Sequence, residues 1–292
     1  MIRSALCTAA VLATAQFSLA APIVFSGVTT AGAADVPFNN TINAFRTTLG
    51  ALNLPGACSP GPCTTGRREI NWDAVPSTAG SPNAFPGDFF NGTAGVQPNG
   101  RVRGASFTTP GTGFRVSATE FSGETAFGPA EFDAFSPAQL FASLGSNITD
   151  VTFAVPGTPS EVAGTRGFGV VFSDVDYTGS ASLEFFDFAG LSLGSYDVPG
   201  VFPTPDGRES RGAFSFLGVV FDDPNVARVR IIAGSHGLDG TFTGNDDAVV
   251  MDDFLYGEPI ARQVPAPSIG ALLALGLGGL ALVRRNAGRR IS

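Results

Sequence analysis

Two adjacent acidic residues near the end of the chain are the sharpest candidates for chemistry. Asp252 and Asp253 interrupt an otherwise apolar run, residues 248–256, whose composition predicts a β-strand. Because neighbouring side chains of a strand point to opposite faces, one of the two carboxylates is expected on the more buried face. A buried carboxylate is costly unless a cation, a set of hydrogen-bond donors or a metal ion compensates its charge.

Calcium is the metal we expect at such a position, because it prefers carboxylate and carbonyl oxygens. A second predicted strand carries Glu69, Asn71 and Asp73. If the first and last strands of a sandwich run side by side, these oxygens lie near the Asp pair. The sequence therefore predicts a calcium site made by these three residues and the Asp pair. The alternative is that the inward Asp accepts backbone N–H bonds or pairs with Arg67 or Arg68.

The composition excludes most enzyme chemistries. All 17 Lys+Arg residues are arginine and there is one histidine, so a lysine Schiff base and a multi-histidine metal site are excluded. A serine hydrolase would need His236 as its base, but the neighbouring Ser235 points elsewhere and no G-x-S-x-G motif occurs. A glycosidase needs only two carboxylates, and acids are plentiful here. We assign no catalytic residue and expect no enzyme, with a secreted hydrolase as the alternative.

Two cysteines close together predict a disulfide bond. Cys58 and Cys63 flank a short Ser/Pro/Gly loop, and such a pair in an exported protein is usually oxidised. The spacing does not match the two-residue spacing of thioredoxin-like redox sites. The third cysteine, Cys7, lies in the expected signal peptide, so the mature chain keeps no unpaired thiol.

The first twenty residues have the order of a secretory signal peptide. Arg3 precedes an apolar stretch, residues 5–15, and Ser18 and Ala20 provide small residues at the −3 and −1 positions of a cleavage site. This arrangement is typical of an export signal and too short for a membrane span. We expect residues 1–20 to be removed, with a later cleavage option at residues 31–34.

An uncharged apolar segment near the other end precedes a basic tail. Residues 264–283 are long enough, as a helix, to cross about 30 Å of hydrocarbon. Positively charged flanks stay in the cytoplasm, so the body is expected on the outer side. The flanking basic residues are Arg284, Arg285, Arg289 and Arg290. A buried core helix is the alternative, but it would not normally be uniformly apolar.

Residues 264–292 resemble the PEP-CTERM sorting signal that exosortase substrates carry. The segment begins Val264, Pro265, Ala266, Pro267, and Ala266 stands where the usual tripeptide has Glu. The resemblance implies an inner-membrane-anchored precursor that an exosortase cleaves near the tripeptide. The body would then pass to the cell surface or extracellular matrix of a Gram-negative bacterium. A permanent single-pass anchor is the alternative.

The body between these two ends is strongly acidic. Without Arg3 and the four arginines of the tail, 12 arginines face 25 Asp+Glu, a net charge near −13. A chain without a basic face is a poor nucleic-acid binder, so we expect no nucleic-acid partner. Residues 35–68 are expected to hold a helix, at residues 41–53, and the disulfide loop. Residues 77–104 are rich in Pro, Gly and Asn and predict a long surface loop.

Residues 69–259 predict a mainly antiparallel β-sandwich or jelly roll. Short apolar runs separated by Gly, Pro, Asn or Asp, with no helical period between them, are typical of that fold. Two sub-domains that divide near residue 160 are the alternative. The expected strands are residues 69–73, 106–108, 114–118, 151–155, 167–176, 182–187, 213–221, 227–232 and 248–256.

The body also resembles uncharacterised exported bacterial proteins of β-sandwich type, through the segments REINWD, GFGVVFSDVD and VVMDDFLYGEP. Its last strand is similar to the closing strand of jelly-roll carbohydrate-binding modules. Sugar-stacking platforms favour Trp and Tyr, whereas this chain has 26 Phe, 3 Tyr and 1 Trp. We therefore expect Ile70, Trp72 and most Phe in the core. The predicted role is structural or adhesive within an exopolysaccharide matrix; a calcium-stabilised carbohydrate-binding module is the alternative.

Overall fold

The computed structural model describes residues 20–30, 34–58, 62–95, 99–123, 131–205, 208 and 210–262. The expected sorting signal and nearly all of the expected signal peptide lie outside the described residues. Those described up to Ala261 belong to one compact unit. No helix in these ranges is long and apolar enough to cross a membrane, and the predicted span, residues 264–283, lies beyond them.

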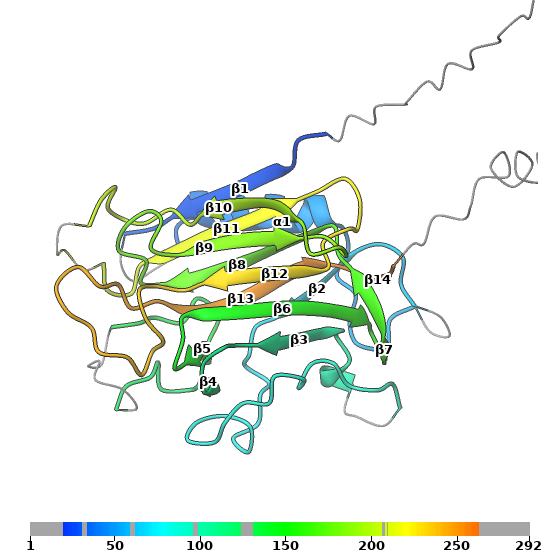
Figure 1. Ribbon diagram of the computed structural model, residues 1–292, viewed down its shortest axis with the longest axis horizontal. Coiled ribbons are helices and arrows are strands. Elements are labelled where there is room, and N and C mark those ends of the chain that lie inside the picture. Colours follow the sequence, from blue (N-terminus) through cyan, green and yellow to red (C-terminus); the bar gives the residue numbers. More distant parts are fainter. Residues whose placement is uncertain are drawn as a thin grey trace, which may run out of the picture. The chain divides into compact units, whose positions relative to one another are not determined.

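Two antiparallel seven-stranded sheets form the body (Figure 1). The first sheet has the order β1 (Ile23–Val28), β11 (Phe214–Val220), β8 (Gly167–Ser173), β13 (Val250–Gly257), β5 (Leu140–Leu144) and β4 (Gly113–Ser117), with β2 (Arg67–Ile70) also paired to β13. The second has the order β10 (Ser192–Asp197), β9 (Ser182–Phe186), β12 (Arg228–Ile232), β6 (Ile148–Val155), β7 (Thr158–Gly164) and β14 (Ile260–Ala261), with β3 (Ala105–Thr108) paired to β6. The predicted β-sandwich is confirmed, while the jelly-roll connectivity stays a prediction. Both sheets contain strands from before and after residue 160, so the two halves of the chain share one core.

The strands of the two sheets differ in their pattern of buried residues because helix α1 (Val36–Leu49) covers the outer face of the first sheet, whereas that of the second sheet is solvated. In the second sheet, β9 and β12 alternate buried and half-buried residues, as strands with one solvated face do. In the first sheet every residue of β8 and β11 is buried. Helix α1 covers that outer face, so these strands read as continuous apolar runs.

Helix α1 starts and ends earlier than predicted. The Asp35 side chain accepts a 2.8 Å hydrogen bond from the Phe38 N–H and caps the first turn. The helix ends before Gly50, whose φ of 109° suits glycine. Its buried face is Phe38, Ile42, Phe45 and Leu49. Leu52, which the predicted helix at residues 41–53 would include, follows the helix and is 44% exposed.

Trp72 is the centre of the aromatic core between the sheets. Its ring stacks on Phe141 with centroids 4.1 Å apart, and Phe254 packs edge-on at 5.1 Å. Ile70 and Trp72 are both buried, as predicted. The prediction of a long surface loop at residues 77–104 is right about its irregular structure but wrong about its exposure. This segment has little regular structure beyond the short helix η1 (Asn99–Arg101), but it buries Phe85, Phe89, Phe90 and Val102 in the sandwich.

Candidate binding site

The Asp pair lies at a β-bulge in strand β13. Met251 pairs with Phe172 and Phe254 with Val170, so β13 has one more residue than β8 in this interval. A bulge changes the direction of the side chains around it. Asp252 is therefore 0% exposed and Asp253 4% exposed, and both contact the same serine. The expectation that strand alternation separates the two carboxylates was wrong, because alternation breaks at the extra residue.

Asp252 is held by a set of hydrogen-bond donors. One of its carboxylate oxygens, Oδ2, accepts the backbone N–H groups of Phe135 at 2.7 Å and Ser136 at 3.1 Å. The indole N–H of Trp72 donates to the Asp252 carbonyl at 2.7 Å and ties the bulge to the core. Backbone N–H donation to the inward Asp was the alternative to calcium in the sequence analysis, and the structure contains it.

The number of available hydrogen-bond donors indicates that Asp252 and Asp253 share a proton. The Ser136 hydroxyl oxygen lies 3.1 Å from Asp252 Oδ1 and 2.9 Å from Asp253 Oδ1. A hydroxyl has one proton to donate, so both contacts are hydrogen bonds only when one carboxyl is protonated. Burial, and then the neighbouring Asp253 charge, raise the pKa of Asp252 to about 8. Burial also raises the pKa of Asp253, to about 6. Asp252 is thus the protonated partner near neutral pH.

Arg46 joins Asp253 to Glu69. Its Nη2 lies 3.3 Å from Asp253 Oδ2 and 3.0 Å from Glu69 Oε2, and Arg67 Nε donates to Glu69 Oε1 at 2.6 Å. Strand β2 pairs with β13 and places Glu69 opposite Leu255, so the predicted proximity of Glu69 to the Asp pair is confirmed. Burial acts to raise the pKa of Glu69, but the hydrogen bonds from the two arginines outweigh it and the pKa is lowered.

The other two residues of the predicted calcium set have different neighbours. Asp73 accepts the backbone N–H groups of Ala138 at 2.7 Å and Gln139 at 3.2 Å. Asn71 donates to the second Asp73 oxygen at 2.8 Å. Within the part of the chain that the structure describes, no group of three or more His, Cys, Asp or Glu side chains is placed to hold a metal ion. Calcium at the Asp pair stays a prediction, and arginine and N–H groups occupy the positions around it.

A hollow of about 390 Å³ opens beside this cluster, and we call it the Asp253 hollow. Its polar lining combines carboxylates, guanidinium groups, amides and a hydroxyl, and its edge includes two exposed leucines, Leu52 at 44% and Leu54 at 64%. The lining residues are Arg46, Leu52, Asn53, Leu54, Pro55, Glu69, Asn71, Arg103, Phe135, Ser136 and Asp253. Of these, the sequence predicted Glu69, Asn71 and Asp253 at the site, whereas Arg46, Arg103 and Ser136 were not predicted.

Arg103 differs from the other basic residues of the hollow. Its guanidinium group forms no hydrogen bond or ion pair with the residues that the structure describes, although the side chain lines the hollow and is only partly exposed. Its nearest ring is that of Phe90, with the guanidinium carbon 5.2 Å from the centroid. Burial lowers the pKa of Arg103, which is the mark of a cation that has lost water and gained no full partner.

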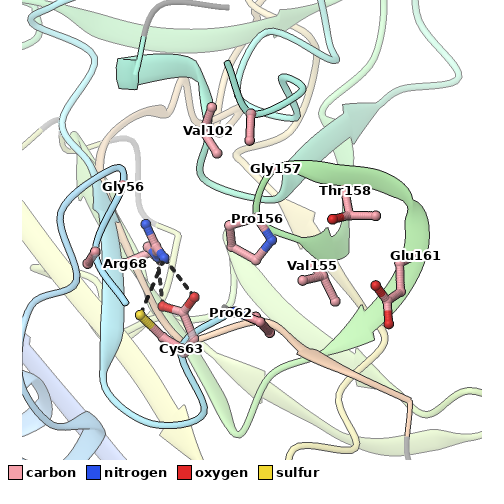
Figure 2. A pocket seen from close by; sticks show the side chains of 13 residues that line it. Gly56, Pro62, Cys63, Arg68, Val102, Val155, Pro156, Gly157, Thr158 and Glu161 are labelled. Atoms are coloured by element: carbon pink, nitrogen blue, oxygen red, sulfur yellow. Dashed lines mark hydrogen bonds and ion pairs between the residues drawn. The ribbon is translucent and has the colours of Figure 1, made fainter. Parts of the chain in front are cut away.

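A second pocket, of about 290 Å³, lies near the disulfide bond and contains Arg68 on one side and Pro156 on the other (Figure 2). Cys58 and Cys63 are bonded as predicted, with an S–S distance of 2.08 Å. Arg68 makes two hydrogen bonds to Glu258, both of 2.7 Å, and Asn53 adds a third to the same carboxylate at 2.8 Å. The buried charges of this pocket, Arg68 and Glu258, already compensate each other, and Glu161 at its edge is exposed. The Asp253 hollow is therefore the better candidate for a ligand.

Comparisons with known proteins add no family. No family model matches the chain, and no curated protein matches it either. Among solved structures, the chain is similar to the enzymatically active domain of tailspike protein 4 of bacteriophage CBA120. The identity is 14%, and the alignment covers 60% of this chain and 21% of that chain, at a TM-score of 0.20. A likeness at this level carries no argument about fold or activity.

Proposed function

We propose that this chain is an exported protein of the cell surface or extracellular matrix that binds a matrix saccharide through the Asp253 hollow. Its role is structural or adhesive and involves no catalysis. The exopolysaccharide is its partner, and an exosortase-type enzyme in the inner membrane processes its precursor. The two terminal signals of the sequence support the export and the anchoring, since both have the order and composition of such signals.

The observation that carries saccharide binding is the chemistry of the Asp253 hollow. Arg103 and Asn71 supply donors, Glu69 supplies acceptor oxygens, and Leu52 and Leu54 form an apolar edge. A sugar presents hydroxyl groups around its ring and C–H groups on its faces, so it needs both kinds of surface. A concave site with a few convergent polar groups is the usual form of a small-ligand site.

Binding is favoured over hydrolysis because the two carboxyls of raised pKa at this site, Asp252 and Asp253, are buried and hydrogen-bonded. A glycosidase needs a protonated carboxyl that reaches the glycosidic oxygen. Asp252, whose pKa is raised to about 8, is fully buried and bonded to residues 135 and 136. Asp253, whose pKa is raised to about 6, is 4% exposed and is bonded to Ser136 and Arg46. Glu69 is held by two arginines, which stabilise the hydrogen-bonded carboxylate and restrict its movement.

The test is binding of the purified full chain to a panel of bacterial polysaccharides, followed by a variant that fills the hollow. Leu54→Trp adds bulk at the edge of the hollow, where the side chain is 64% exposed, so the fold should tolerate it. Leu191→Trp is the matched control, because Leu191 is 66% exposed and does not line the hollow. We expect Leu54→Trp to abolish retention and Leu191→Trp to leave it unchanged. Retention that survives Leu54→Trp would contradict the site.

A further inference from the structure

We infer that the saccharide bound in the Asp253 hollow is acidic, and that its carboxylate is bound by Arg103. This inference rests on the proposed function and specifies its ligand class. The positive and negative charges around the hollow do not balance. Two carboxyls, Glu69 and Asp253, and two guanidinium groups, Arg46 and Arg103, line the hollow. Asp252 and Arg67 belong to the same hydrogen-bonded cluster but lie outside the lining.

The pairing of the other groups isolates Arg103. Arg46 bonds to both Glu69 and Asp253, with the distances given above. Arg67 bonds to Glu69, and its Nη1 also donates to the Gly50 carbonyl at 2.5 Å. Asp252 is the protonated member of the Asp pair and contributes no charge near neutral pH. The remaining balance is one positive charge, and Arg103 is the group that carries it without a hydrogen bond.

The position of Arg103 suits a carboxylate. Arginine presents a planar fork of N–H groups that matches the two oxygens of a carboxylate, and such charge-assisted bonds are stronger than neutral ones. The Phe90 ring lies against the guanidinium on one side, which reduces the side chain's freedom before a ligand arrives. Partial burial has already removed some of the water that a ligand would otherwise have to displace.

The hollow fits a uronate better than an inorganic anion. Its volume of about 390 Å³ leaves much unfilled space around one phosphate, whose oxygens also have no use for an apolar edge. A uronate would contact Leu52 and Leu54 with the C–H groups of its ring while its carboxylate reaches Arg103. Glu69 and Asn71 line the same hollow and remain available to the ring hydroxyls.

The test compares three probes by calorimetry in calcium-free buffer at pH 6: a galacturonate oligomer, the matching neutral galactose oligomer, and inorganic phosphate. The full chain is used as wild type, Arg103→Gln, Arg103→Lys and Arg101→Gln. Arg101 is the matched control, because it also lies on a phenylalanine ring, 4.1 Å from the Phe89 centroid, but does not line the hollow. Thermal melting of each variant checks that it is folded.

We expect the acidic oligomer to bind at least about tenfold more tightly than the neutral one, as hydrogen bonds to charged groups allow. Arg103→Gln should remove that preference, Arg103→Lys should keep part of it, and Arg101→Gln should keep all of it. Equal binding of both oligomers would overturn the inference and leave the proposed function standing. Binding of phosphate in place of the acidic oligomer would overturn the sugar assignment. If neither oligomer nor any polysaccharide of the panel binds, the proposed function itself fails. If Arg103→Gln does not fold, the wild-type preference and Arg103→Lys still decide.

Discussion

Arg68 and Arg103 show how two arginines in neighbouring hollows have different roles. Arg68 is 3% exposed and makes two 2.7 Å hydrogen bonds to Glu258, itself 2% exposed. Arg103 is partly exposed and lines the Asp253 hollow, and its guanidinium group makes no hydrogen bond to any residue that the structure describes. A buried charge pair with matched geometry is a part of the fold, whereas an unmatched cation at a hollow is available to a ligand. Both arginines line a pocket, so this position alone does not distinguish a structural arginine from one that binds a ligand.

Strand β2 explains how the two hollows come to lie so close together. Its residues alternate between half-buried and buried, so Arg67 and Glu69 point toward α1 and the Asp253 hollow. Arg68, between them, points the other way and lines the pocket with Glu258. One short strand therefore supplies charged groups to both sites through ordinary strand alternation.

The largest effect is expected where the buried pair is broken. Glu258→Ala should lower the free energy of unfolding by about 3–5 kcal/mol, because Arg68 would keep a buried charge without a partner. Glu161→Ala is the matched control: Glu161 lines the same pocket but is exposed. Urea unfolding followed by tryptophan fluorescence measures both, since Trp72 lies in the core. A loss below about 1 kcal/mol for Glu258→Ala would contradict the role given to this pair.

The second effect concerns pH and the Asp pair. The folded-state pKa of Asp252, about 8, is above its ordinary value of 3.8, so the folded protein binds more protons than the unfolded chain. The stability from this group is complete below about pH 4 and is lost as pH rises toward 8. Asp174 and Asp247, with pKa values raised by burial to about 9 and about 7, act in the same direction.

We therefore expect the free energy of unfolding to be at least about 2 kcal/mol lower at pH 8 than at pH 5. Asp252→Asn should flatten part of this slope, and the slope left over belongs to Asp174, Asp247 and Asp253, whose pKa burial also raises. Urea unfolding at several pH values gives the curve. Stability that rises from pH 5 to pH 8 would show that these carboxyls are ionised in the folded protein.

A third effect, of about 2 kcal/mol, is expected from the disulfide bond. Cys58 and Cys63 close a short loop, and a crosslink of that length stabilises by about this amount. The double variant with both cysteines changed to serine should melt at a lower temperature, roughly 4–8 °C below wild type. Reduction of the wild type should give the same shift. An unchanged melting temperature would mean that packing around Arg68 holds this loop without the crosslink.

The sequence predicted those features that depend on local pattern. Nine strands were expected in segments where strands lie, because their apolar runs are distinct. Five strands were missed: β1, β5, β7, β10 and β14. In β7 and β10 the reason is composition, since TPSEVAG and SLGSYD hold few apolar residues and gain their order from neighbouring strands. Phe85 and Phe90 are likewise buried by distant neighbours: both contact Trp72, and Phe89 packs on the two of them. The local sequence of this irregular segment does not indicate those contacts.

The site was predictable only in part. Strand pairing brought Glu69 to the Asp pair as expected, but the bulge was not expected, because nothing in the local pattern separates a regular strand from a bulged one. Arg46 and Ser136 come from a helix and a loop distant in sequence. The tertiary fold brings the Arg46 guanidinium and the Ser136 hydroxyl to the position where the spacing of acidic residues in the sequence had indicated a metal ion.

The smallest effect on stability is expected from Arg103→Gln. This variant tests most directly whether Arg103, unlike Arg68, is dispensable for folding. The guanidinium makes no hydrogen bond to a described residue, so its removal should change the free energy of unfolding by less than about 1 kcal/mol. Relief from burial of an unpaired charge can make the change favourable. Arg68→Gln, the same substitution in the neighbouring pocket, should cost several times more, since it leaves the buried Glu258 unpaired. Equal losses for the two variants would show that Arg103 also belongs to the fold. If Arg103→Gln keeps the wild-type stability but loses the preference for the acidic oligomer, then Arg103 serves binding while Arg68, in the neighbouring pocket, serves folding.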